Sequence, residues 1–76
     1  MKLDILFYEC EHPGDLNNYA DDITSCGGNV VHKEVCCDSE TGRVIVSVED
    51  KNEFVFNFKK TESFDFSYMT ENNELL

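Results

Sequence analysis

Hydrophobic and polar positions alternate with a period of two across most of residues 42–68. The alternation comes in three runs, Val44-Val46-Val48, Phe54-Phe56-Phe58 and Phe64-Phe66-Tyr68. β-Branched and aromatic residues at this period are typical of β-strands, and the polar stretches 50–52 and 60–63 separate the runs as turns would. The pattern therefore predicts an antiparallel meander of three strands with one apolar face.

Two further alternating runs lie in the N-terminal half, on either side of a helical pattern. Residues 2–10 carry apolar side chains on both sides, which favours a strand in the interior of a sheet. Residues 29–37 alternate as a second strand, and the turn that follows ends at Gly42, which can adopt a positive φ.

Between these runs, apolar residues recur at helical spacing. Leu16, Tyr19, Ala20 and Ile23 occupy positions i, i+3, i+4 and i+7, which place them on one face of a helix. Asp15 is the expected N-cap, and the glycine pair at 27–28 is the expected end. We expect about three turns of helix, with polar residues on the outer face.

The expected element order is β-α-β-β-β-β, an α+β fold in which a single helix packs on a four- to five-stranded, mainly antiparallel sheet. Residues 1–76 form one small acidic domain, whose tail at 70–76 has no strong pattern and is expected to fray. Because a helix joins the first two strands, the first strand could lie parallel to a neighbour through a right-handed crossover. One helix covers only about two or three strands, so the rest of the apolar face requires a curled sheet, the tail or a second copy.

Acidic residues dominate the charge of the chain. Sixteen Asp and Glu residues oppose six Lys and Arg residues, which gives a formal net charge of −10. The excess lies in residues 1–29 and 61–76, whereas residues 30–60 are nearly balanced. Such a surface disfavours direct binding to nucleic acid or anionic lipid, and it favours a basic protein surface as the partner. The alternative is that the acidity serves only solubility.

The chain shows no secretory or membrane signal. No long apolar segment follows Met1, and no run of about 18 apolar residues occurs that could cross a bilayer. We therefore expect a cytoplasmic location, which is the host cytoplasm if the protein is phage-encoded. In that compartment the four cysteines stay reduced, and the spacing of cysteines and histidines matches no zinc site. No metal or other cofactor is expected.

No catalytic motif is present, and we expect a protein without enzymatic activity. A Cys–His pair can form, but no glycine elbow or oxyanion turn accompanies a cysteine. Neither a phosphate-binding loop nor a calcium loop occurs, and so small a chain offers little room for a deep pocket. A site for an anionic small ligand remains open only if the central bases gather into one pocket. These bases are Lys33, Arg43, Lys51, Lys59 and Lys60.

The remaining candidate for function is the acidic face of the predicted helix with its flanking residues. Carboxylates on a rigid element can imitate a row of phosphates and compete for a basic groove. Asp15, Asn18 and Asp22 are expected along one outward stripe, with Asp21 beside it. The predicted partner-binding residues are Glu9, Glu11, Asp15, Asn18, Asp21 and Asp22.

In size, acidity and predicted build, the chain resembles small phage-encoded anti-defence proteins, including anti-CRISPR and anti-restriction mimics of nucleic acid. The resemblance is one of class and involves no sequence motif. It implies an inhibitor that blocks the basic nucleic-acid-binding surface of a host nuclease or nucleic-acid-binding complex. Two alternatives remain, an immunity protein or antitoxin that neutralises a basic nuclease, and a non-catalytic homodimeric regulatory module.

Overall fold

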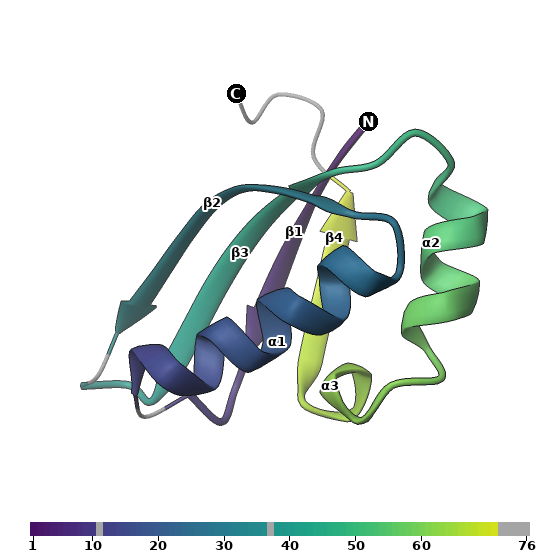
Figure 1. Cartoon of the computed structure of the whole chain (residues 1–76). Helices are drawn as coiled ribbons and strands as arrows, with labels where there is room; N and C mark the ends of the chain where they lie inside the picture. Colours follow the sequence, from purple (N-terminus) through teal and green to yellow (C-terminus); the bar gives the residue numbers. More distant parts are fainter. Residues whose placement is uncertain (11, 37, 72–76) are drawn as a thin grey trace.

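The computed structural model describes residues 1–10, 12–36 and 38–71. Its elements in chain order are β1 (Lys2–Phe7), α1 (Pro13–Ser25), β2 (Asn29–Cys36), β3 (Thr41–Ser47), α2 (Lys51–Phe58), α3 (Glu62–Asp65) and β4 (Ser67–Glu71). The four strands form one antiparallel sheet in the order β2-β3-β1-β4. The helices lie on one face of this sheet, with α1 crossing it diagonally and α2 alongside (Figure 1). The predicted α+β class is confirmed.

The topology is a split βαβ arrangement, the ferredoxin-like order of elements with α3 as a one-turn addition. β1 is an interior strand, as its two-sided apolar pattern predicted. The expectation of a parallel neighbour for β1 is wrong, because both of its neighbours pair with it antiparallel. α1 connects β1 to β2, which run parallel to each other but are separated by β3.

The second run of the predicted meander is a helix and not a strand. Asp50 caps α2, since its carboxylate accepts a hydrogen bond from the Glu53 amide at 3.1 Å. Phe54 and Phe58 are buried at 2% and 0% exposure, whereas Phe56 between them is 63% exposed. Residues four apart, such as Phe54 and Phe58, lie on the same side of both a helix and a strand. Only Phe56 distinguishes the two structures, because it would share that side in a strand and does not in a helix.

The third run of the meander also differs from the prediction. Phe64 lies in α3 and Phe66 is the C-cap residue of that helix, so the strand expected at 64–68 begins only at Ser67. The first two residues of the tail that was expected to fray, Thr70 and Glu71, belong to β4 and pair with β1. The rest of that tail, 72–76, lies outside the described residues.

The core lies between the sheet and the helices. β1 contributes Leu3, Ile5 and Phe7, and β3 contributes Val44 and Val46, all fully buried. The predicted apolar stripe of α1 covers these strands with the buried residues Leu16, Ala20 and Ile23. The Phe7 ring lies edge-on to the Phe58 ring, with centroids 6.5 Å apart, so α2 completes the same core.

The ends of α1 set the positions of its polar residues. The helix begins at Pro13 with His12 as N-cap, two residues before the predicted cap at Asp15. Asp15 instead sits in the first turn, where its carboxylate accepts a hydrogen bond from the His12 amide at 3.3 Å. The predicted end is confirmed, because Gly27 adopts a φ of 96° directly after the helix.

Candidate functional site

An acidic pocket lies at the N-terminal end of α1. Its volume is about 470 Å³, and it is lined by Glu9, Asp15, Tyr19 and Glu40. Glu9 and Asp15 belong to the predicted partner-binding set, so the fold brings two of those residues together. Glu40 comes from the turn between β2 and β3 and adds a third carboxylate, which sequence reasoning missed.

Two hydrogen bonds to backbone carbonyl groups fix the shape of this acidic pocket. The Tyr19 hydroxyl donates a hydrogen bond to the Glu9 carbonyl at 2.8 Å, and the Tyr19 ring stacks on Phe7 with centroids 4.3 Å apart. The Cys10 amide donates to the Glu40 carbonyl at 2.9 Å, which ties the end of β1 to the turn before β3. The carboxylates are therefore carried by segments anchored to the core.

Glu40 holds an unusual backbone conformation. Its φ is 54°, in the left-handed region that favours glycine, whereas Gly42, the residue predicted to take a positive φ, does not. Gly42 lies within β3, where an added Cβ would stand 2.8 Å from Cys10 Sγ and from Leu16 Cδ1. This conformation costs about 1–2 kcal/mol for a residue with a side chain. Strained residues of this kind often lie at functional sites, so the Glu40 carboxylate is a candidate for partner binding.

The environment of the same pocket changes the pKa of the Tyr19 hydroxyl. Burial raises the pKa of Tyr19 above its ordinary value, and the nearby Asp15 carboxylate raises it further. The phenol therefore stays protonated at neutral pH and keeps its hydrogen bond to the Glu9 carbonyl. A negative potential of this kind favours an entering cation, such as a lysine or arginine side chain.

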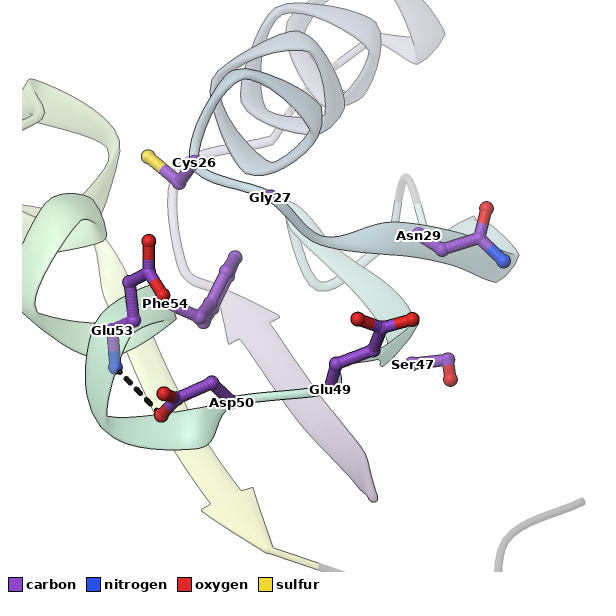
Figure 2. Close-up of a pocket in the computed structure, with 8 residues that line it drawn as sticks. All are labelled: Cys26, Gly27, Asn29, Ser47, Glu49, Asp50, Glu53 and Phe54. Atoms are coloured by element: carbon purple, nitrogen blue, oxygen red, sulfur yellow. Dashed lines mark hydrogen bonds between the residues drawn. The ribbon is translucent and has the colours of Figure 1, made fainter.

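A second acidic pocket lies at the C-terminal end of α1. Its volume is about 350 Å³, and its lining residues are Cys26, Gly27, Asn29, Ser47, Glu49, Asp50, Glu53 and Phe54. Figure 2 shows three carboxylates, those of Glu49, Asp50 and Glu53, on the segment that leads into α2 and on its first turn. Asp50 already serves as the cap of α2, so Glu49 and Glu53 are the carboxylates left to face a partner.

The other predicted residues lie along α1 between these pockets. Asn18 and Asp21 are exposed, as expected. Asp22 is only partly exposed and accepts a hydrogen bond from the Ser63 hydroxyl, so it faces α3 and not open solvent. Glu11 lies outside the described residues.

The ion pairs of the basic residues lie away from the two acidic pockets. Among the described residues, the ion pairs join Arg43 to Asp4 and Glu34, His32 to Glu34, and Lys51 to Glu71. None of these pairs takes a carboxylate from α1 or from either acidic pocket. Lys33 does reach α1, but it donates to the Asn17 amide oxygen at 2.7 Å.

Four of the five central bases, all except Lys59, engage separate places and do not gather into a site for an anionic ligand. Lys33 contacts α1, Arg43 contacts β1 and Lys51 contacts β4. The Lys60 ammonium lies 4.1 Å from the centroid of the Phe56 ring, on the outer side of α2. Because these four cations engage four different places, they form no common pocket, and the small-ligand alternative loses its structural basis.

The described residues also contain no metal-binding cluster. No three His, Cys, Asp or Glu side chains among them come together in a way that could hold an ion. Three cysteines lie in the described part of the chain, and Cys10, Cys26 and Cys36 form no disulfide with one another. None of the described helices has the length and apolar character needed to cross a membrane.

Comparison with known proteins does not assign the chain to a class. The sequence matches no protein family and no curated protein, and the fold matches no solved structure. The two acidic pockets and the helix between them form the candidate site.

Proposed function

We propose that this protein is an acidic, non-catalytic inhibitor that blocks a basic nucleic-acid-binding surface, in the manner of phage-encoded anti-CRISPR and anti-restriction proteins. Its partner-binding surface, here named the α1 acidic surface, consists of α1 and the pockets at its two ends. The carboxylates of this surface are Glu9, Asp15, Asp21, Glu40, Glu49 and Glu53.

The observation that carries the proposal is the separation of charges on the molecule. The ion pairs among the described residues lie on the sheet and between α2 and β4, and they involve none of Glu9, Asp21, Glu40, Glu49 and Glu53. Lys33 does reach α1, but there it bonds the Asn17 amide oxygen and not a carboxylate. Unneutralised carboxylates on an anchored helix attract a basic partner and orient it during approach.

The length of the surface supports the mimicry of nucleic acid. α1 has 13 residues. At about 1.5 Å per residue the helix is roughly 20 Å long, so its two end pockets are separated by about that distance. Along one strand of B-DNA the phosphates follow every 3.4 Å or so of the helix axis, so roughly 20 Å corresponds to about six of them. Carboxylates at both ends and in the middle of α1 thus cover the footprint of a short nucleic-acid segment.

The test is a capture experiment with tagged protein in a bacterial lysate. We expect capture of a nuclease or nucleic-acid-binding complex at low salt, and release when double-stranded DNA or RNA is added as a competitor. High salt should weaken the capture, because screening shortens the reach of the charges. Capture of a single basic nuclease toxin would assign the same surface to an immunity protein or antitoxin.

Charge-reversal variants locate the surface. Glu9→Lys combined with Asp21→Lys should reduce capture at least tenfold. Glu62→Lys combined with Asp65→Lys is the control, because it changes the net charge equally at exposed positions of α3. Equal loss in both double variants would show diffuse electrostatics and not a defined surface. The proposal would be overturned if the tagged protein captures nothing that added nucleic acid can release. The regulatory-module alternative would then remain.

A further inference from the structure

The face of the sheet opposite the helices is uncovered. Alternate residues of each strand point to it, and the strand register places them in two rows across the sheet. One row is Glu34, Arg43, Leu6 and Tyr68, and the other is His32, Ile45, Asp4 and Thr70. Together with Tyr8, which follows β1, these residues are named here the open sheet face.

Charge on the open sheet face is nearly balanced, because Arg43 opposes the carboxylates of Asp4 and Glu34. The Arg43 guanidinium bonds both oxygens of the Asp4 carboxylate, with Nε at 2.9 and 3.0 Å and Nη2 at 2.6 Å. Its Nη1 lies 3.7 Å from Glu34, and Glu34 also lies 3.7 Å from the His32 ring. The chain as a whole carries −10, so almost none of the excess lies on this face.

The other half of the open sheet face is apolar. Leu6 and Tyr68 are cross-strand partners on β1 and β4, exposed at 37% and 60%. Tyr8 is 48% exposed, and its hydroxyl donates to the Ser67 carbonyl at 3.0 Å, which holds the ring beside β4. Aromatic side chains held in place on a flat sheet are the residues that contribute most to protein interfaces.

We propose that the open sheet face is an interface between two copies of this chain, stacked sheet against sheet. A strongly basic partner would be drawn to the carboxylates on the helical side and away from this nearly neutral face. Two copies that meet through the open sheet face keep almost all of their excess negative charge on the outer sides, and each presents the same Tyr8, Leu6 and Tyr68 to the other across a two-fold axis. Two sheets pack at about 10 Å through such side chains.

The size of the face fits this interface. The molecule has principal extents of 33 × 27 × 16 Å, so it is flat. The two longer extents limit the projected area of the broad side to roughly 900 Å², and a standard interface buries about 800 Å² on each partner, so the dimer would use most of this side. Stacking through the open sheet face would leave α1 on the outside of both copies, so the dimer would present two α1 acidic surfaces.

Sedimentation velocity over a range from low micromolar to near-millimolar protein tests the interface. We expect a monomer–dimer equilibrium that shifts toward the dimer at high salt, because screening reduces repulsion between two anionic chains. This salt dependence is opposite to that of the proposed capture of a basic partner, so the two proposals can fail independently.

Two variants with equal net charge separate the open sheet face from the rest of the surface. Tyr68→Glu should weaken the dimer at least tenfold, whereas Phe56→Glu should leave it unchanged, although the two rings are similarly exposed at 60% and 63%. Circular dichroism checks that both variants fold. A monomer at every concentration and salt, an equal effect of both variants, or assembly beyond a dimer would overturn the proposal.

Discussion

The Ser63 hydroxyl donates a hydrogen bond to the Asp22 carboxylate and thereby joins α3 to α1. Ser63 is a buried polar residue with 4% exposure, and Asp22 is partly covered. The bond gives a buried hydroxyl its partner and gives a short helix a fixed place. Asp22 therefore contributes to the fold, whereas Asp21, the adjacent residue, is free to face a partner.

Removing this bond should destabilise the protein without affecting partner capture. Ser63→Ala leaves a partly covered carboxylate without its donor, which costs about 1–2 kcal/mol of the free energy of unfolding. Urea denaturation measures the loss. Ser25→Ala, at an exposed position of the same helix as Asp22, is the control and should change stability little. An unchanged midpoint for Ser63→Ala would show that α3 is held by its apolar contacts alone.

Gly28 is packed closely against three side chains of the core. An added Cβ would stand 2.7 Å from Val46 Cγ1, 2.8 Å from Ile23 Cγ2 and 2.9 Å from Phe54 Cε1. Gly28→Ala should therefore lower the free energy of unfolding by about 1–3 kcal/mol through overpacking. Gly14→Ala is the matched control, because nothing lies within 4 Å of its Cβ position. Similar stabilities of the two variants would contradict the close packing around Gly28.

The sequence predicted the parts of the fold that rest on long periodic patterns. Alternation in β1 and the apolar stripe of α1 each extend over enough residues to identify the element, although β1 ends at Phe7, short of the expected residue 10, and α1 begins before its expected cap. The run at 54–58 is too short to do so, because Phe54 and Phe58 share a side in either structure. The signal for a helix was present in Asp50 and Glu53, the spacing of an N-terminal capping motif.

The candidate site could be predicted only in part, because its pockets are assembled by tertiary contacts. Glu9 and Asp15 were found from their place beside the predicted helix. Glu40 joins them because β3 pairs with β1, and this sheet order brings the turn before β3 to the end of β1. Local patterns do not determine which strands become neighbours, so no signal in the sequence placed Glu40 next to Glu9.

The cysteines should differ in reactivity. Hydrogen bonds from the Ser39 side chain and backbone lower the pKa of the exposed Cys36 thiol, whereas burial raises the pKa of Cys26. A lower pKa gives more thiolate at a given pH, so Cys36 should be alkylated at a lower pH than Cys26. Mass spectrometry of protein treated with iodoacetamide across a pH series measures this, in a Cys37→Ser background that removes the adjacent thiol.

Ser39→Ala is the control for that assignment. Loss of the hydroxyl donor should move the alkylation profile of Cys36 toward higher pH and leave that of Cys26 in place. If the profile of Cys36 does not move, the hydrogen bond from the Ser39 hydroxyl does not determine the reactivity of this thiol.

Substitutions of Glu40 should separate stability from partner binding. Glu40→Gly removes a side chain from a backbone with a φ of 54°, so it should raise the free energy of unfolding by up to about 1 kcal/mol. The same change removes a carboxylate from the pocket that Glu9 and Asp15 share, so capture of the basic partner should fall. Urea denaturation and the capture experiment measure the two effects.

Glu40→Gln tests whether the charge is the cause of the second effect. The amide keeps the side chain and the backbone conformation, so stability should stay unchanged while capture falls as it does for Glu40→Gly. If Glu40→Gln binds as well as the original protein, the carboxylate of Glu40 has no part in recognition. The left-handed conformation would then be a consequence of the tight turn before β3, where the Glu40 carbonyl accepts the hydrogen bond from the Cys10 amide.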